Sequence, residues 1–415
     1  MCRPSDDQTA QVAPKHDESR ADDFPWHIGV CDAHCHPTDT MSSIASMSGM
    51  RARVLTIMAT RSQDQDLVAS VAAQHSIADR AALNLPATQV SDKVVPAFGW
   101  HPWFSYQLYD DTAGTENRTY DPAVPDVAAQ KAKHYGAVLT PSPDADFIAS
   151  LPDPRPLSNF IAETRHRVLN AQTALIGEVG LDKAFRLPWA WNEEEHSGRD
   201  ESLTPGGREG RTLSPYHVKM GHQVQILKAQ LRLAGELGVA VSIHGVQGHG
   251  VLFDALASLW KGHEKEVVSR RKQKLVAEGA EDFSSSDEDE PEGGASLTGK
   301  RHKQMPFPPR VCLHSFSGAP QMLNQYLNPA IPVRVFFSFS TVINLSTPGG
   351  ESKFPDVIRA CPDDRLLVES DLHTAGDEMD RVLEDMYRRV CGIKGWTLEQ
   401  GLLRIRKNYE EFIFG

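Results

Sequence analysis

Six side chains that can bind divalent metal ions follow or end short apolar runs spread along the chain. They are His34 and His36 in CDAHCH, Glu178 in IGEVGLD, His244 in VSIHG, His314 in CLHSFSG and Asp371 in VESDLH. Imidazole and carboxylate groups are common protein ligands of divalent metals. Each run has the composition of a β-strand, so each group is expected where a strand passes into a loop. This pattern favours a hydrolase with a binuclear metal centre.

Strand geometry predicts which side chains converge. Residues two apart on a strand face the same way, so His34 and His36 point inward and Cys35 points outward. Asp32 lies on the same predicted face and is expected to orient a ligand imidazole. Glu178 offers two oxygens, and a carboxylate can bridge two cations where an imidazole cannot.

The two remaining groups extend this pattern to the other strands. His244 shares a predicted face with Ala240 and Ser242, whose small side chains leave room beside it, and Asp371 shares a face with Glu369. A single buried histidine is more often a hydrogen-bonded core residue than a ligand. Several polar side chains buried together at one end of a barrel cost desolvation free energy unless they are paired or bound to cations. The set as a whole therefore predicts a metal site.

A seventh candidate is His101, which follows Trp100 in FGWHP and precedes Pro102. We expect it to contact a substrate phosphate or to donate a proton. The alternative is that it only caps the end of its strand.

Eight β-type segments are expected, with helical patterns between several of them: 29–36, 53–60, 94–102, 174–182, 239–246, 310–318, 333–340 and 365–372. The clearest helix is 217–237, where Val224, Leu227, Leu231 and Ala234 recur at helical spacing and Gly238 ends the run. Alternating strands and helices predict a (β/α)8 TIM-type barrel. A doubly wound sheet has a similar strand count, but only a closed sheet brings the first and eighth strands together.

The 415 residues are divided into a disordered tail at 1–25 and a single catalytic barrel domain at 26–415. Insertions are expected at about 105–160, 184–215 and 262–308. Residues 281–292 hold seven acids and no base, which predicts a disordered segment and a docking surface for a protein partner. Without this segment and the tail, the formal charge of −12 falls to about −2. Such a barrel is compatible with a nucleic-acid substrate, since metal ions can supply positive charge.

The expected location is the cytoplasm or nucleus, without membrane insertion. No apolar run approaches the length of a membrane span, and the N-terminal residues lack the order of a secretory signal. The six cysteines are scattered without C-x-x-C spacing, which indicates free thiols in a reducing compartment.

These motifs together resemble the TatD family of metal-dependent deoxyribonucleases, within the amidohydrolase superfamily. The matching pieces are D-x-H-C-H at 32–36, G-W-H-P at 99–102, I-G-E-x-G-L-D at 176–182, His244, L-H-S-F-S-G at 313–318 and E-S-D at 369–371. The long insertions and the acidic serine tract resemble a fungal branch. The chain differs from the usual pattern in lacking an arginine shortly after His244 and a proline after Asp371.

The resemblance implies a two-metal site and hydrolysis of DNA from its 3′ end. His34, His36 and Asp371 would hold one ion, His244 and His314 the other, and Glu178 would bridge them. Asp371 would also orient or deprotonate the attacking water, and His101 would bind substrate. The family is usually described with magnesium, whereas four imidazoles suit manganese or zinc better.

Two other functions remain open. One is hydrolysis of a different ester or amide, since the superfamily acts on several such substrates. The other is a non-catalytic interaction protein built on the same barrel.

Overall fold

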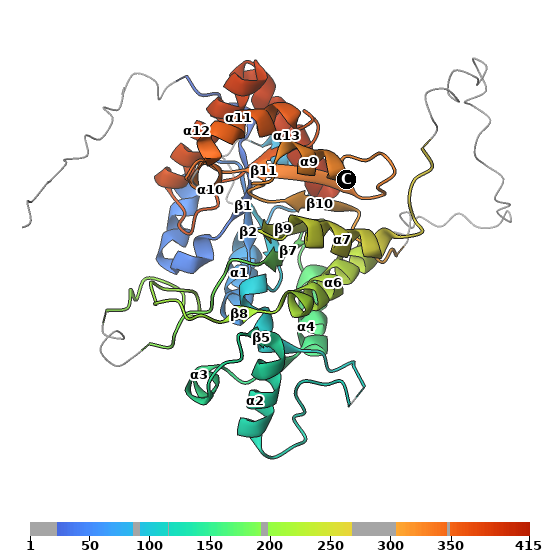
Figure 1. Cartoon of the computed structure of the whole chain (residues 1–415). Helices are drawn as coiled ribbons and strands as arrows, with labels where there is room; N and C mark the ends of the chain where they lie inside the picture. The colour runs from blue at the N-terminus through green and yellow to red at the C-terminus, as the bar shows by residue number, and fades with distance from the viewer. Residues whose placement is uncertain (1–22, 86–91, 115, 192–197, 268–303, 347–348) are drawn as a thin grey trace, which may run out of the picture.

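The computed structural model describes residues 23–85, 92–114, 116–191, 198–267, 304–346 and 349–415 (Figure 1). Eight parallel strands form one sheet, in which each strand pairs with the next in chain order. They are β1 (Cys31–Cys35), β2 (Val54–Met58), β3 (Val94–Phe98), β7 (Leu175–Asp182), β9 (Val241–Val246), β10 (Arg310–Leu313), β11 (Arg334–Phe339) and β12 (Leu366–Val368). All eight expected segments contain one of these strands.

Backbone hydrogen bonds between the end of β1 and the residues that follow β12 join the two edges of the sheet. Asp371 N donates to His34 O at 3.0 Å, and His36 N donates to Leu372 O at 2.8 Å. The sheet is therefore a nearly closed barrel, as the sequence predicted. A doubly wound sheet would have kept its first and last strands apart.

Alternation of side chains along the strands separates two hydrophobic layers. On β2, for example, Val54 and Met58 belong to one buried cluster, whereas Leu55 and Ile57 belong to another. The second cluster also contains residues from the surrounding helices, so it forms the layer between barrel and helices.

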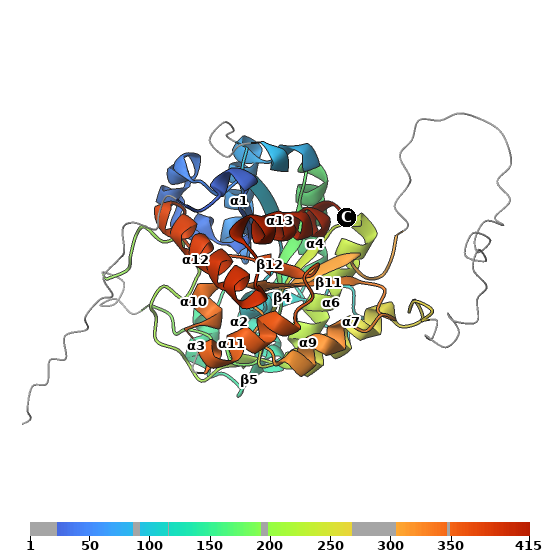
Figure 2. The same ribbon diagram turned by 90° about the horizontal axis from the view of Figure 1, so that it is seen from above.

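The helices surround the barrel (Figure 2). Those that follow a strand in chain order are α1 (Ser62–His75), α4 (Leu157–Asn170), α6 (Met220–Leu237), α7 (His249–Trp260), α9 (Pro320–Tyr326), α10 (Thr341–Asn344) and α12 (Asp377–Lys394). The helix α11 (Gly350–Ala360) follows α10, and α13 (Leu398–Phe414) follows α12. Helical 3-10 segments are η2 (Trp26–Ile28), η3 (Pro37–Gly49), η4 (Arg80–Asn84) and η6 (Pro102–Gln107).

The helix predicted at 217–237 begins three residues later than expected. His217–Val218 form the short strand β8, which pairs with β5 (Leu139–Thr140), so α6 starts at Met220. Its end is as predicted, because Gly238 adopts the left-handed conformation that stops a helix without a steric penalty.

The insertion at 105–160 folds into ordered elements. It contains α2 (Val127–Val138) and α3 (Ala145–Ser150) together with the short strands β4 (Leu108–Tyr109) and β6 (Arg155–Pro156). Tyr135 and Phe147 lie in a small hydrophobic cluster that also includes Leu187, Tyr216 and Val218 from a later part of the chain. In Figure 1 α2 and α3 extend below the barrel.

The other segments named from the sequence are described in part. Most of 262–308, including the acidic run 281–292, lies outside the described residues, as does 1–22 of the predicted tail. Phe24, placed in that tail by the sequence, is instead buried against Trp26 and Tyr387, with ring centroids 4.8 and 6.3 Å away.

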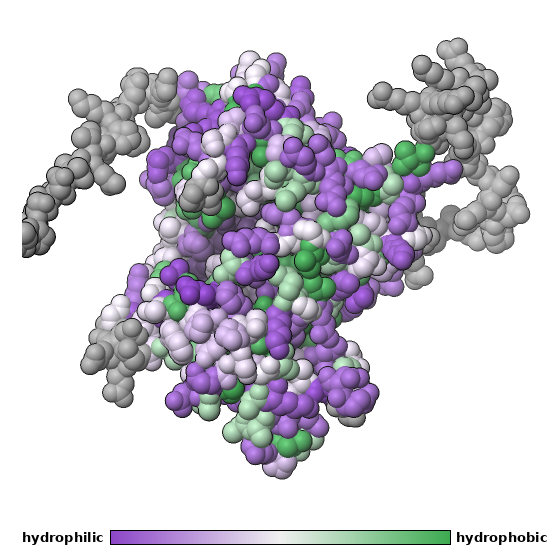
Figure 3. Space-filling view, viewed as in Figure 1, coloured by the Kyte–Doolittle hydropathy of each residue, from purple (hydrophilic) through white to green (hydrophobic). Residues whose placement is uncertain are grey.

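The surface and the cysteines show no unusual features in the described parts. The face in Figure 3 is mostly hydrophilic, with hydrophobic residues in small scattered groups. The five described cysteines are buried free thiols. Within the described residues, every helix is too short or too polar to cross a membrane.

Candidate metal centre

The six predicted ligands converge at one end of the barrel, with Glu178 at their centre. Its Oε2 faces the β1 pair, 3.7 Å from His34 Nε2 and 3.5 Å from His36 Nε2. Its Oε1 faces the other pair, 2.8 Å from His244 Nδ1 and 2.6 Å from His314 Nε2. One carboxylate therefore presents its two oxygens to two separate pairs of imidazoles.

Asp371 joins the first of these pairs. Its Oδ1 lies 3.5 Å from His36 Nε2 and 3.9 Å from His34 Nε2. Its backbone has a φ of 55°, in the left-handed region that aspartate tolerates better than most residues. The backbone bond from Asp371 N to His34 O ties this conformation to the seam of the barrel.

Two of the ligand candidates lie inside strands, not at their ends as the sequence suggested. β7 and β9 continue as a pair past Glu178 and His244, with Asp182 opposite Val246. Gly180 makes this close pairing possible: its φ is 156°, and a Cβ at this position would lie 2.0 Å from His244 O. Any larger residue would push β7 away from β9.

The neighbours of the imidazoles determine which nitrogen faces the centre. His244 Nε2 lies 3.2 Å from Asp182 Oδ2, so a proton on Nε2 leaves the Nδ1 lone pair directed at Glu178 and His314. His34 Nδ1 lies 2.8 Å from Ser242 Oγ, which leaves its Nε2 for the centre. Neither role, of Asp182 or of Ser242, was predicted from the sequence. The available signal was strand alternation, which puts Asp182 on the same face as Glu178.

Asp32 was expected to orient a ligand imidazole, but its carboxylate makes other contacts. Its Oδ1 accepts hydrogen bonds from the backbone N–H groups of His34 at 3.1 Å and Ser370 at 3.0 Å. The β1–β2 register shifts between Asp32 and Cys35, so simple alternation does not hold here. The carboxylate instead fixes the backbone next to both His34 and Asp371.

Glu369 lies behind His314. It accepts hydrogen bonds from the hydroxyls of Ser315 and Ser338 and from Ser315 N, and its Oε1 is 3.6 Å from His314 Nδ1. That distance is too long for a strong hydrogen bond. Glu369 thus supplies a nearby negative charge to His314 while the serines hold it in place.

His101 lies against the same centre, with Nε2 3.2 Å from Glu178 Oε1. Its Nδ1 accepts a hydrogen bond from Trp103 N at 3.2 Å, which caps η6. An accepting Nδ1 requires the proton of a neutral imidazole to be on Nε2. His101 therefore both caps a helix and directs a hydrogen-bond donor into the site.

The electrostatics of the centre favour charged carboxylates. Burial raises the pKa of Glu178, but its electrostatic interactions with His101 and His314 and the hydrogen bonds from the imidazoles outweigh burial and hold the pKa well below its usual range. Burial likewise opposes ionisation of Asp371, but His36 and the neighbouring imidazoles lower its pKa to about 2. Burial lowers the pKa of His101 to about 4, despite the charge of Glu178.

This donor set fits divalent cations. His34 Nε2 and His36 Nε2 are 3.1 Å apart, as are His244 Nδ1 and His314 Nε2. The lone pairs of two nitrogens at this distance repel each other unless a cation or a shared proton lies between them. The buried sets His34–His36–Glu178 and His101–Glu178–His244 have ligand atoms within 4.8 Å of one another and could each hold a metal ion.

The centre opens into a cleft of about 680 Å³, which we call the metal cleft. One wall carries Arg61, whose guanidinium pairs with Asp39 at 2.9 Å and Asp64 at 3.0 Å. Another wall is formed by residues of the insertion at 184–215, among them Thr204, Gly207 and Arg208. The insertion therefore contributes to the mouth of the site.

Comparisons of the sequence with known proteins found a matching family model and similar proteins. The family model described as "TatD related DNase" matches residues 31–413. The chain is 34% identical to "Cut9-interacting protein scn1" of Schizosaccharomyces pombe over 384 residues, which cover 92% of this chain and 98% of the relative. It is 24% identical to a protein of Saccharomyces cerevisiae described as an uncharacterized deoxyribonuclease, over 92% of this chain and 99% of the relative.

Solved structures of low sequence identity also align with the chain. A TatD homologue from Escherichia coli has a TM-score of 0.44 and 15% identity, with 91% of this chain and 95% of that chain covered. A TatD-family hydrolase from Entamoeba histolytica has a TM-score of 0.46 and 11% identity, with 93% and 98% covered.

Proposed function

Because the chain belongs to the TatD-related DNase family, we propose that it removes nucleotides from the 3′ end of DNA by hydrolysing phosphodiester bonds at a two-metal site. Family membership makes the chain a hydrolase of the deoxyribonuclease type. The direction of cleavage, the number of ions and the roles of individual residues are the proposal.

The observation that carries the two-metal proposal is the position of Glu178. Its two oxygens face the His34–His36 pair and the His244–His314 pair separately. His34, His36 and Asp371 would hold one ion, and His244 and His314 the other, with Glu178 shared. Divalent ions held there would bind the scissile phosphate, lower the pKa of a bound water and stabilise the leaving oxygen.

The protein groups then orient and move protons. Asp371 directs Oδ1 toward the imidazoles, so Oδ2 is the atom available to accept a proton from the attacking water. His101 presents its Nε2 proton beside Glu178 and would donate it as a hydrogen bond to a non-bridging phosphate oxygen. In this proposal Glu178 acts by holding the ions and placing their charge, not by transferring a proton.

The proposal is tested with the purified full-length chain, elemental analysis of bound metal, and DNA labelled at its 5′ end. With added magnesium, manganese or zinc, cleavage from the 3′ end produces a ladder of labelled products that shorten with time. His34→Ala and Glu178→Ala should abolish this ladder, whereas the exposed residues His166 and Glu201 provide the controls His166→Ala and Glu201→Ala.

Each alternative has its own outcome. Immediate release of a labelled mononucleotide would mean cleavage from the 5′ end, and cleavage of circular DNA would mean endonuclease activity. Unchanged cleavage in the His34 and Glu178 variants would point to a contaminating nuclease and overturn the proposal. Bound metal without DNA cleavage by the wild type would favour another ester or amide as substrate.

A second proposed property is binding to a protein partner, favoured by the description of the S. pombe relative as a Cut9-interacting protein. We place this contact in the acidic run 281–292, which lies outside the described residues, and the protein in the cytoplasm or nucleus. Affinity purification of the full chain and of a chain lacking 281–292 tests it. Identical sets of co-purified proteins would exclude this segment as the docking site.

A further inference from the structure

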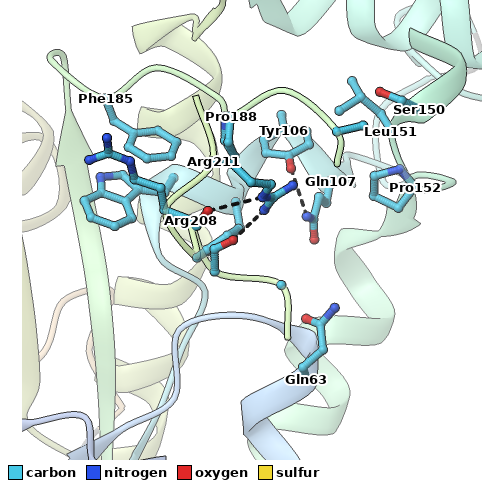
Figure 4. Close-up of a pocket in the computed structure, with 15 residues that line it drawn as sticks. Gln63, Tyr106, Gln107, Ser150, Leu151, Pro152, Phe185, Pro188, Arg208 and Arg211 are labelled. Atoms are coloured by element: carbon cyan, nitrogen blue, oxygen red, sulfur yellow. Dashed lines mark hydrogen bonds between the residues drawn. The ribbon is translucent and has the colours of Figure 1, made fainter. Parts of the chain in front are cut away.

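A second cavity, of about 300 Å³, adjoins the metal cleft, and we call it the side cavity. Trp103, Phe104, Gly207 and Arg208 line both spaces. The side cavity lies between η6 and the insertion at 184–215, and Figure 4 shows its lining side chains. Arg208 therefore stands at the border between the metal cleft and a separate space.

The side cavity is positively charged. Arg208 and Arg211 line it, and no Asp or Glu does so among the described residues. Neither guanidinium lies within 4.0 Å of a carboxylate in the described part of the chain, because the nearby Glu209 pairs with Arg199 instead. Arg211 donates to the backbone oxygens of Trp189, Gly207 and Arg208, which satisfies hydrogen bonds but does not neutralise charge.

The rest of the side cavity is aromatic and amide-bearing. Phe185 stacks on Trp103, with ring centroids 4.4 Å apart and an angle of 10° between the planes. Gln107 Nε2 donates to the hydroxyl of Tyr106 at 3.2 Å. In Figure 4 the Phe185 ring lies on one side of Arg211, while Gln107 and Pro152 lie on the other. Unpaired guanidiniums bind phosphate, and aromatic rings bind nucleobases.

The loop that carries these arginines is tied to the segment that follows the ligand His36. Thr204 donates through its hydroxyl to Thr38 O at 2.5 Å and through its backbone N to Asp39 O at 2.8 Å. Arg61 donates to the backbone oxygens of Thr204 at 3.2 Å and Pro205 at 3.2 Å. These bonds set the position of Gly207 and Arg208 relative to the metal centre.

We propose that the side cavity binds the nucleotide next to the scissile phosphodiester of single-stranded DNA. Arg208 holds the phosphate of this nucleotide at the border of the two cavities, Arg211 adds positive charge deeper inside, and Phe185 and Tyr106 contact the base. The proposal deepens the proposed nuclease function and rests on it. The chain lacks an arginine shortly after His244, where it has Gly245, Val246 and Gln247. In this proposal Arg208 supplies the phosphate-binding positive charge that such an arginine would give.

The test compares Arg208→Gln with Arg186→Gln. Arg186 is an exposed arginine of the same insertion that lines neither cavity, so both changes remove one positive charge. Binding of a fluorescein-labelled hexathymidylate is measured by anisotropy in EDTA, where no hydrolysis occurs. Hydrolysis of the hexanucleotide and of bis(p-nitrophenyl) phosphate, a diester with no neighbouring nucleotide, is measured with added manganese.

We expect Arg208→Gln to weaken hexanucleotide binding about tenfold and to lower the slope of log K against log salt by about 0.7. Its KM for the hexanucleotide should rise by a similar factor, with a much smaller change in the hydrolysis of bis(p-nitrophenyl) phosphate. Arg186→Gln should resemble the wild type in all three measurements. Because Arg208 makes no side-chain bond recorded in the described structure, its replacement is not expected to affect folding.

Other outcomes overturn the side-cavity proposal. Equal losses with both substrates would place Arg208 on the scissile phosphate, and equal effects of Arg208→Gln and Arg186→Gln would mean a general charge effect. Unchanged binding in Arg208→Gln would leave the side cavity without a role in DNA binding. If wild type binds the hexanucleotide through Arg208 but hydrolyses neither substrate, the nuclease proposal fails while the binding site stands.

Discussion

Replacement of Asp182 tests whether the arrangement of the imidazoles depends on the residues behind them. Asp182 Oδ2 accepts from Trp103 Nε1 at 2.6 Å and lies 3.2 Å from His244 Nε2, while Oδ1 accepts from the backbone N–H groups of Ala184 and Phe185. In Asp182→Ala, His244 loses the acceptor that keeps its proton on Nε2. The proton can then occupy Nδ1, the nitrogen that faces Glu178, and block coordination.

The expected size follows from these contacts. Loss of a carboxylate partner behind a ligand histidine typically costs about 10- to 100-fold in metal affinity, or about 1.4–2.7 kcal/mol. Each buried donor left without an acceptor costs about 1–3 kcal/mol of folding stability. Asp182→Asn should have a smaller effect on metal affinity, because the amide oxygen can still accept from His244. It should cost folding stability, because the NH2 group then faces the backbone N–H groups of Ala184 and Phe185.

The assay is calorimetric titration of manganese or zinc into protein freed of metal by a chelator, with urea unfolding of the same samples in EDTA. Asp182→Ala should lose affinity for one ion more than for the other, since His34 and His36 are not touched. Trp103→Phe is the matched control: it removes the other donor to the same oxygen and leaves the Asp182–His244 contact in place. Wild-type affinity and stoichiometry in Asp182→Ala would refute the reasoning about the proton on His244.

Three further predictions follow from the same structure. Glu178→Gln should reduce bound metal from two ions to at most one by elemental analysis and lower diester hydrolysis more than about 100-fold; two retained ions would contradict a shared carboxylate. Gly180→Ala should lower the midpoint of thermal unfolding by several degrees, because the added Cβ would lie 2.0 Å from His244 O and overpacking costs about 1–3 kcal/mol. An unchanged midpoint would show that the backbone of β7 can shift without a loss of stability. Burial lowers the pKa of His134 to about 4, so the neutral form is favoured in the folded state. Stability should then fall as the pH decreases from about 6.5 toward 4, by up to about 3 kcal/mol. Urea unfolding of wild type and His134→Gln between pH 4 and 8 would measure it, and identical profiles would exclude His134; His222, whose pKa burial also lowers, contributes with the same sign in both proteins.

The barrel strands and the ligand candidates could be predicted from the sequence because both depend on local patterns. Short β-type runs separated by helical patterns specify eight parallel strands, and the period of two places polar side chains such as Ser242 and His244 on one face. Closure of the sheet then brings the strand ends to one rim whatever the loops contain. These features do not require knowledge of contacts between distant segments.

The prediction for Asp32 was wrong because the register shift in β1 breaks that period. The prediction that Glu178 and His244 end their strands was also imprecise. The strands β7 and β9 continue to pair after these residues, as far as Asp182 opposite Val246. The expected segments 174–182 and 239–246 nevertheless contain β7 and β9 in full, so only the place of the two ligands within their strands was predicted wrongly.

Only the tertiary structure decided how the groups face one another. The sequence determined that Glu178 is a carboxylate among histidines, but packing determined that its oxygens face different imidazole pairs. Asp182 gained its partner His244 through the β7–β9 register, and Arg208 reached the metal cleft through hydrogen bonds between its loop and Thr38 and Asp39. The physical reason is that side-chain type and face are local properties, whereas hydrogen-bond direction and charge pairing depend on distances between segments that meet only after folding.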